Sequence, residues 1–247
     1  RALAGSQPAR RLARCRRQVP EMQGQREDLI DPTLRPLAVH RALVGFYGEP
    51  AWHRRRDPLE ELVATILSQN TSDTNSGRAF ASLKASFNSW EDVASAPAEY
   101  IARVIQSGGL HQIKAARIKQ VLKQIEKEQG RISLDFLKPK TMTEAEDYLM
   151  RLPGVGHKTV SCVLLFSLGK PSLPVDTHVF RVAKRLGLID FKVSIEKAPG
   201  LLQKQIPASK VYQFHIHMIE HGRRICRARQ PRCNRCILGG ICPSSLC

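Results

Sequence analysis

The chain has 247 residues, and its 39 Lys and Arg against 22 Asp and Glu give a formal net charge of +17 at pH 7. This length allows one large domain or two medium domains with cores of their own. The positive charge indicates a polyanionic partner, first nucleic acid and second an anionic membrane surface. No apolar run approaches the roughly 18 residues of a spanning helix, which excludes a transmembrane protein, and an aromatic content of 6% disfavours a sheet that stacks single-stranded bases.

The first 27 residues form a basic segment that cannot build a core. Its arginines cluster between positions 10 and 17, and no acidic residue precedes Glu21. This composition predicts a solvated tail, with a DNA-tethering arm or an organelle transit peptide as alternatives. Cys15 lies within the tail and has no partner pattern.

Helical patterns begin at Leu37, and the clearest start signal is Asp57 followed by Pro58. Aspartate is a preferred N-cap, and proline suits the first helical position. Apolar residues then recur at helical spacing as far as Leu67 and predict one buried stripe. The polar run 68–73 follows directly. It indicates a surface loop or cap, or less commonly a polar wall that faces a ligand.

Further helices are expected near 74–87 and 97–106. The chain is then interrupted by Ser-Gly-Gly-Leu, which leaves the large apolar side chain of Leu110 next to two glycines. Later in the chain, Thr143 and Glu146 match a capping box, in which each side chain bonds the backbone of the other residue. This box predicts the start of a helix that ends near residue 152.

A Gly-x-Gly turn at 154–156 lies between two predicted helices, which together form a helix-hairpin-helix. Glycine leaves backbone N–H groups open to close approach, and a helix N-terminus favours an anion, so the turn suits a phosphate. Lys158 lies in the first turn of the second helix, where the helix dipole favours the neutral amine that a nucleophile requires. An exposed lysine beside an ordinary tight turn is the simpler alternative.

Pro171 and Pro174 break the chain before Asp176, which is a natural N-cap for the next helix. Capping alone would account for this aspartate. A short helix is expected around residues 201–202, and His215 falls on the apolar side of the last long helix, where we expect it to be packed. Because no convincing alternation with a period of two appears, the predicted fold is all-α.

Four of the seven cysteines crowd into residues 226–242 with the spacing C-x6-C-x2-C-x5-C. Such crowding is typical of a metal site in a reducing compartment rather than a disulfide scaffold. Zinc and a 4Fe–4S cluster both accept four thiolates, but only one pair has the C-x2-C spacing of a zinc ribbon, which favours 4Fe–4S. The candidate ligands are Cys226, Cys233, Cys236 and Cys242. The interleaved basic residues indicate a DNA-facing loop: Arg227, Arg229, Arg232 and Arg235.

The segment from His217 to His221 also matches the H-x-x-E-H pattern of inverted zinc peptidases. Short patterns arise often by chance, and this one adjoins a complete set of four cysteines. Two packed or surface histidines explain it better.

Four segments together resemble the endonuclease III branch of the helix-hairpin-helix DNA glycosylases, over roughly residues 57–242. They are Leu-Pro-Gly-Val-Gly-His-Lys at 152–158, Val-Asp-Thr-His-Val-Phe-Arg at 175–181, His-Gly-Arg at 221–223 and the four-cysteine tail. The resemblance implies two all-α helical domains that flank a DNA cleft. A six-helix barrel with the hairpin would occupy 58–170, and an iron–sulfur cluster domain would combine 28–57 with 171–247, leaving 1–27 as a flexible basic tail.

The resemblance also implies a bifunctional DNA glycosylase and AP lyase of base excision repair, acting on oxidised pyrimidines in duplex DNA. Lys158 matches the nucleophile that forms a Schiff base before β-elimination, and Asp176 matches the catalytic aspartate. Hairpin residues would grip a phosphate, often with a bound monovalent cation: Leu152, Gly154, Val155 and Gly156. The polar patch around the flipped nucleotide and the apolar wedge would comprise Ser68, Gln69, Asn70, Asp73 and, as the wedge, Leu110.

Two features depart from the family pattern. Asn70 stands where the usual bacterial form has glutamine, which leaves the preferred lesion open, and the basic N-terminal extension lies outside the pattern. The alternatives are a non-catalytic DNA-binding or redox-sensing iron–sulfur module, a zinc-bound structural protein, and a glycosylase directed at mismatched thymine or uracil. We expect a monomer with no membrane partner, in a bacterial cytoplasm or nucleoid, with nucleus or mitochondrion as alternatives.

Overall fold

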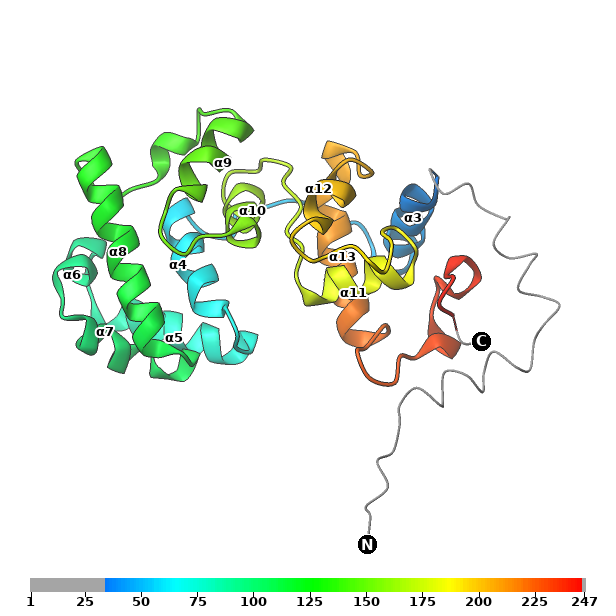
Figure 1. Ribbon diagram of the computed structural model, residues 1–247, viewed down its shortest axis with the longest axis horizontal. Helices are drawn as coiled ribbons and strands as arrows, with labels where there is room; N and C mark the ends of the chain where they lie inside the picture. The colour runs from blue at the N-terminus through cyan, green and yellow to red at the C-terminus, as the bar shows by residue number, and fades with distance from the viewer. Residues whose placement is uncertain (1–33, 246–247) are drawn as a thin grey trace, which may run out of the picture. The chain divides into compact units, whose positions relative to one another are not determined.

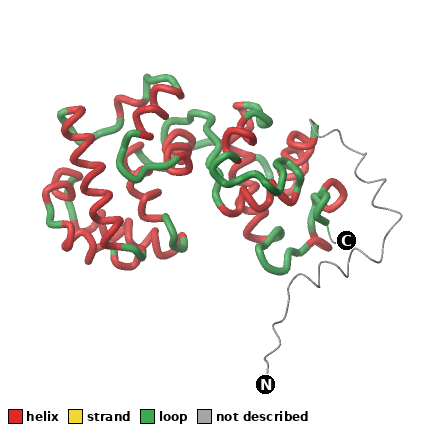
Figure 2. Tube along the Cα trace, viewed as in Figure 1, coloured by secondary structure: helices red, strands yellow, loops and turns green. Residues whose placement is uncertain are grey.

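The computed structural model describes residues 34–245, and every regular element in this range is a helix (Figures 1 and 2). The predicted all-α fold is confirmed. The tail at 1–27 with Cys15, and the terminal Cys247, lie outside the described residues. The α-helices are α3 (Arg35–Tyr47), α4 (Pro58–Ser68), α5 (Asp73–Ser86), α6 (Trp90–Ser95), α7 (Ala98–Val104), α8 (His111–Gln129), α9 (Met142–Met150), α10 (His157–Phe166), α11 (Thr177–Arg185), α12 (Ala198–Gln203) and α13 (Val211–Arg224).

Five short 3-10 helices complete the secondary structure: η1 (Gln106–Gly108), η2 (Asp135–Leu137), η3 (Ala208–Lys210), η4 (Cys233–Arg235) and η5 (Gly239–Ile241). Between residues 34 and 245, no helix combines the length and the apolar character needed to cross a bilayer.

The chain divides into two compact units, each described here by itself. The hairpin unit comprises Ala51–Pro174 and Ala208–Tyr212. The cysteine unit comprises the described parts of Arg1–Pro50, Val175–Pro207 and Gln213–Cys247. The domain bounds expected from the sequence, at 57/58 and 170/171, stay a prediction.

In the hairpin unit, α4 is the central helix and packs against α5, α8 and α10. It begins where the sequence predicts, because Asp57 Oδ1 accepts a hydrogen bond of 2.9 Å from the Glu60 amide. The apolar stripes of α4 and α8 meet in a core that excludes solvent. Fully buried members of these stripes include Leu62, Ile66, Ile118 and Leu122.

The capping box of α9 lies two residues earlier than the sequence analysis predicts. Thr141 is the N-cap, and its side chain accepts from the Glu144 amide at 3.2 Å while the Glu144 carboxylate accepts from the Thr141 amide at 2.8 Å. The predicted pair of Thr143 and Glu146 was therefore wrong. Both pairs satisfy the same T-x-x-E pattern, and the earlier start adds hydrogen-bonded backbone to the helix.

In the cysteine unit, α3, α11 and α13 contribute the buried apolar residues Val39, Leu43, Val179, Phe214 and Met218. His215 is buried, as predicted. The predicted short helix near residue 201 is α12. Gly222 lies against α11: a Cβ atom there would be 3.0 Å from His178 Cβ, so a larger residue would disturb this packing.

Candidate functional site

The turn between α9 and α10 presents free backbone amides. Gly154 adopts φ +68°, in the left-handed region that favours glycine. Gly156 is the N-cap of α10, and no side chain caps this helix end. The N–H groups of the first turn of α10 lack helical acceptors, which leaves them available to an anion. The Val155 amide, by contrast, donates to Leu152 O at 3.2 Å, so it serves the turn itself.

Lys158 is the second residue of α10, directly after this turn. Its side chain is half-buried. Within the described range it forms no hydrogen bond and no ion pair, whereas the neighbouring His157 faces Glu146 at 3.8 Å. The following residues Thr159 and Val160 are buried and anchor the helix. Lys158 therefore lies in the first turn of α10, next to the open amides in the chain, and its amine has no partner among residues 34–245.

The polar run after α4 is tied to other helices of the hairpin unit through Gln69. The Arg117 guanidinium donates to Gln69 Oε1 at 2.7 Å, and Gln69 Nε2 donates to Thr159 Oγ1 at 3.5 Å. Asn70 is exposed with φ +52°, and Ser68 donates its hydroxyl to Thr65 O at 2.8 Å. The structure thus brings Gln69 to the residue that follows Lys158.

Asp73 begins α5, after its N-cap Ser72, and is exposed. It belongs to the predicted polar patch together with Ser68 and Asn70. These three residues lie close together in the chain, and Gln69 between them makes a hydrogen bond to Thr159 of α10.

Leu110 is the exposed tip of the turn before α8. Its side chain is 51% exposed, and its backbone adopts φ +49°, an uncommon conformation for leucine. The buried Lys114 connects this turn to the end of α4, because its ammonium donates to Gly108 O at 2.9 Å and to Leu67 O at 2.7 Å. Burial lowers the pKa of Lys114. Sequence reasoning missed this lysine, although it lies four residues before Ile118 on the apolar side of α8.

Asp176 lies at the start of α11 in the cysteine unit. Its Oδ1 accepts a hydrogen bond of 2.8 Å from the Val179 amide, which confirms the predicted N-cap. Burial lowers the pKa of His178 and of Arg181. The negative charge of Asp176 acts on both groups in the opposite direction and partly offsets this effect. Asp176 is half-buried and retains a second carboxylate oxygen for other partners.

Arg181 and Arg185 tie α11 to the first cysteine. Arg181 donates to Gly222 O at 2.9 Å and to Cys226 O at 3.1 Å. Arg185 donates to Cys226 Sγ at 3.4 Å and to Arg227 O at 2.7 Å. Sequence reasoning missed both roles, because neither bond follows from local spacing.

The four candidate ligands form no disulfide and lie close enough together for their charges to interact, in the segment that contains η4 and η5. Burial raises the pKa of Cys242 to about 11, and the charges of the other three cysteines act in the same direction. No group of three or more His, Cys, Asp or Glu between residues 34 and 245 is placed to hold a single metal ion.

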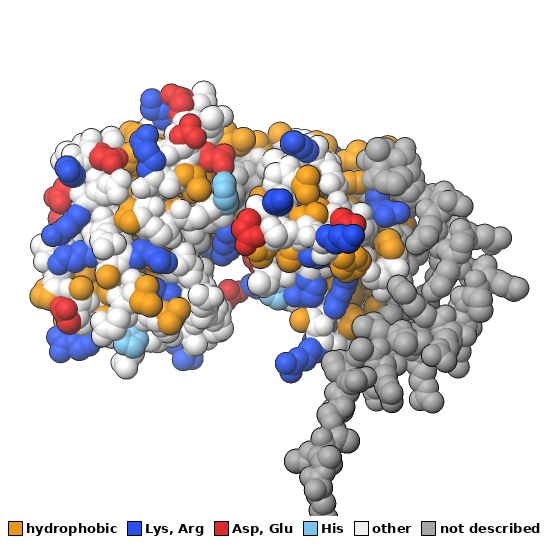
Figure 3. Space-filling view, in the orientation of Figure 1, with side chains coloured by type: hydrophobic (Ala, Val, Ile, Leu, Met, Phe, Trp, Pro, Cys, Tyr) orange, Lys and Arg blue, Asp and Glu red, His pale blue; other side chains and the backbone are white. Residues whose placement is uncertain are grey.

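The arginines between these cysteines are exposed at all four positions: Arg227, Arg229, Arg232 and Arg235. Figure 3 shows Lys and Arg side chains spread over the visible surface of the described residues.

The histidines of the H-x-x-E-H pattern are buried in the cysteine unit. His217 stacks on Tyr47 with ring centroids 5.8 Å apart. His221 faces the Tyr47 hydroxyl at 3.2 Å and Cys236 Sγ at 3.4 Å. Burial lowers the pKa of His221 to about 4, so its ring is neutral at pH 7. Packed histidines, rather than a peptidase site, account for the pattern.

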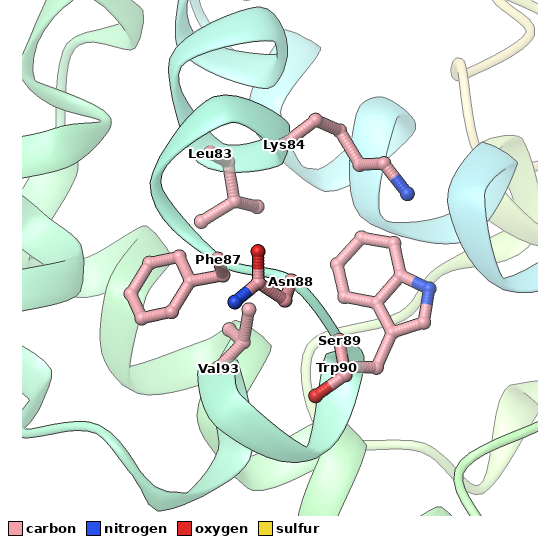
Figure 4. A pocket seen from close by; sticks show the side chains of 7 residues that line it. All are labelled: Leu83, Lys84, Phe87, Asn88, Ser89, Trp90 and Val93. Carbon is pink, nitrogen blue, oxygen red and sulfur yellow. The ribbon is translucent and has the colours of Figure 1, made fainter.

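A shallow hollow at the turn between α5 and α6 shares no residue with the sites above (Figure 4). Phe87, Asn88 and Trp90 line it, and the Lys84 ammonium lies 5.1 Å from the Trp90 ring. Its volume of about 80 Å³ is small for a ligand pocket.

Comparison with known proteins relates this geometry to a family. The model of the HhH-GPD superfamily of base excision DNA repair proteins matches residues 63–208. Endonuclease III of Thermotoga maritima is 34% identical over 194 residues, which cover 78% of this chain and 86% of that protein. An Arabidopsis thaliana protein, provisionally named a DNA glycosylase, is 42% identical over 168 residues, but the chain spans only 57% of its length.

The fold of this chain is also similar to that of a solved structure. It shows an endonuclease III trapped as a covalent intermediate with DNA, in an estranged-adenine complex. The TM-score is 0.75 at 29% identity, covering 88% of this chain and 98% of that one.

Proposed function

Because this chain belongs to the HhH-GPD superfamily of base excision DNA glycosylases and is homologous to endonuclease III, we propose that it is a bifunctional glycosylase and AP lyase for oxidised pyrimidines in duplex DNA. The observation that carries the proposal is Lys158, an amine without an internal partner beside uncapped helix amides. A non-catalytic DNA-binding module would need the amides but not this amine.

The backbone phosphate would bind first, at the N-terminus of α10. The N–H groups of the first turn, from Gly156 to Thr159, lack helical acceptors, and the helix dipole favours the anion. A damaged base cannot be reached inside the duplex, so its nucleotide must flip out at a cost of a few kcal/mol. The exposed Leu110 is suited to fill the space that the base leaves in the stack.

The chemistry would begin when neutral Lys158 Nζ attacks C1′ of the sugar. The bond between C1′ and the base breaks, and the base leaves with the bonding electron pair and takes up a proton. The sugar ring then opens to a Schiff base with the lysine. The iminium acidifies a 2′ proton, and its removal expels the 3′ phosphate by β-elimination. Asp176 would stabilise positive charge on the sugar or move protons through its second oxygen.

Four thiolates in one neighbourhood fit a 4Fe–4S cluster, which we propose as the resident group at Cys226, Cys233, Cys236 and Cys242. When bound, the cluster would link these cysteines and shape the arginine loop, and it would supply no step of the base release. The exposed arginines would then add phosphate contacts. A monovalent cation at the hairpin is part of the same proposal.

Borohydride trapping tests the central claim. The enzyme is mixed with duplexes that contain thymine glycol or an abasic site, and covalent adducts are counted with and without Lys158→Ala. Lys123→Ala is the matched control, because Lys123 is an exposed lysine of the same unit. We expect an adduct with the wild type and with Lys123→Ala only. No adduct with either duplex, or an adduct unaffected by Lys158→Ala, would overturn the proposal.

Substrate choice needs a separate measurement. Single-turnover base release is compared across oxidised pyrimidines, 8-oxoguanine, and thymine or uracil mispaired with guanine. Fastest release of an oxidised pyrimidine supports the proposal. Fastest release of mispaired thymine or uracil would replace it with the mismatch-directed alternative.

A further inference from the structure

Gln69 is held on three sides within the hairpin unit. Lys114 fixes the backbone two residues earlier by donating to Leu67 O. The Arg117 guanidinium binds Gln69 Oε1 at 2.7 Å, and Gln69 Nε2 lies 3.5 Å from Thr159 Oγ1. Gln69 thus directly precedes Asn70 in the chain. Its side chain lies beside Thr159, the residue that follows Lys158.

The chemistry of Arg117 determines which way the Gln69 amide faces. A guanidinium carries only donors, so a group 2.7 Å from it must be an acceptor. A flipped amide would direct its NH2 group at the guanidinium, with no hydrogen bond formed. The carbonyl oxygen is therefore committed to Arg117, and the outward part of Gln69 is its NH2 group. One of these N–H bonds faces Thr159, and the other finds no acceptor within the described range.

The hairpin in turn holds Arg117. A Cβ atom at residue 154 would lie 2.0 Å from Arg117 Nε, so the guanidinium occupies the space that Gly154 leaves open. Arg117 is also held by its own helix, next to the buried Ile118. The orientation of Gln69 is thus coupled to the turn that is proposed to bind the phosphate.

We propose that Arg117 is a positioning residue, which orients the Gln69 amide so that only its NH2 group faces outward. Gln69 then determines specificity by donating hydrogen bonds to acceptors on the edge of a base. The inference rests on the proposed function, because it takes duplex DNA as the ligand. The acceptor belongs either to the damaged base or to the base opposite it. The carbonyl oxygens and ring nitrogens of bases are the acceptors that an NH2 group can read.

The test measures binding by fluorescence anisotropy, with Lys158→Ala in every variant so that the duplex stays intact. Duplexes contain thymine glycol, and one acceptor at a time is deleted: N7 or N3 of the opposite adenine with deaza analogues, or a carbonyl oxygen of the pyrimidine with thio analogues. Gln69→Glu keeps an acceptor for Arg117 but removes both outward donors. Arg117→Met removes the orienting donors and leaves the amide free to rotate.

For the parent protein, we expect one deletion to weaken binding by about 10-fold, the size typical of a single base contact. Gln69→Glu should bind the intact duplex about 10-fold more weakly and lose sensitivity to that same deletion. Arg117→Met should retain less than half of the sensitivity, and Arg117→Lys should recover part of it. Arg131→Met, which removes the same charge from an exposed position, should leave the sensitivity unchanged.

Two outcomes would overturn the inference. In one, every deletion weakens the parent and Gln69→Glu equally, so that Gln69 reads no acceptor. In the other, Arg117→Met keeps the full sensitivity, so that Arg117 does not orient the amide. Because binding requires no covalent chemistry, these results are independent of whether borohydride traps an adduct.

Discussion

The guanidinium of Arg185 lies 3.4 Å from the sulfur of Cys226. It also binds the carbonyl oxygens of Arg227 at 2.7 Å and of Ala228 at 3.2 Å. One side chain thus places positive charge beside a candidate ligand and holds the backbone that follows it. Both contacts hold the sulfur at a defined position, and hydrogen bonds to sulfur are a recognised control of cluster properties.

Arg185→Met should therefore weaken retention of the proposed cluster. We expect lower iron and sulfide content per chain, weaker visible absorbance, and a stability loss of roughly 1–3 kcal/mol from the unpaired carbonyl groups. Iron analysis and thermal unfolding measure these effects. Arg229→Met, at an exposed position of the same loop, is the control and should leave iron content unchanged. Equal iron content in both variants would contradict the role given to Arg185.

Arg229→Ala should weaken DNA binding uniformly across sequences. If the exposed arginine contacts one phosphate, the slope of log affinity against log salt concentration should fall by about one. Binding isotherms at several salt concentrations measure the slope, and visible absorbance shows whether the loop is intact. Glu99→Gln, on the exposed start of α7, serves as a surface control. An unchanged slope would place Arg229 outside the DNA interface.

Asp176→Asn should separate the two roles of this residue. Asparagine caps a helix about as well as aspartate, so the melting temperature should change little. Loss of the carboxylate should slow base release by about 100-fold or more, with DNA binding largely retained. Asp176→Ala should add a stability loss of about 1 kcal/mol. Release rates of Asp176→Asn near those of the wild type would leave the residue with capping alone.

Gly154 and Gly156 should respond differently to alanine. Gly154 has φ +68°, and a Cβ there would meet Arg117 at 2.0 Å, so Gly154→Ala should lower stability by at least about 1–2 kcal/mol. Gly156→Ala meets nothing within 4 Å and should leave stability nearly unchanged. It should weaken DNA binding if a phosphate approaches this backbone. Urea unfolding and anisotropy distinguish the two, and similar stability losses would contradict the geometry.

The capping box of α9 should contribute a measurable pH dependence. Hydrogen bonds from Thr141 hold the pKa of Glu144 at about 2, below its ordinary 4.5. Because the folded pKa is depressed, this contribution is complete above pH 4.5 and is lost as the pH falls toward 2. Glu144→Gln retains a capping side chain without titrating. Its urea midpoint should fall less than that of the wild type between pH 5 and pH 2, and parallel curves would exclude the effect.

Local chemistry explains most of what could be predicted from the sequence. Asp57 and Asp176 cap helices because an aspartate oxygen at the N-cap accepts a hydrogen bond from an otherwise unpaired N–H of the first turn. The predicted start of α9 was wrong because Thr141–Glu144 and Thr143–Glu146 both match T-x-x-E, and the sequence pattern alone does not distinguish them. The helix α6 was missed because six residues are too few to show a period.

Long-range pairs could not be predicted, because spacing along the chain says nothing about partners in space. Arg117 and Gln69 are 48 positions apart, and Arg185 and Cys226 are 41 apart. Lys114 was hidden for another reason. A lysine on an apolar face is ordinarily expected to extend its charge into solvent. The burial of Lys114 is explained by the two carbonyl groups that accept hydrogen bonds from its ammonium.

The backbone of Leu110 has a consequence for engineering this protein. At φ +49° a leucine is strained by about 1–2 kcal/mol relative to glycine, and its side chain gains little burial in return. Leu110→Gly should therefore raise the melting temperature while reducing affinity for damaged duplexes. A screen that rewarded thermostability alone would select this change and discard the side chain that we propose as the wedge.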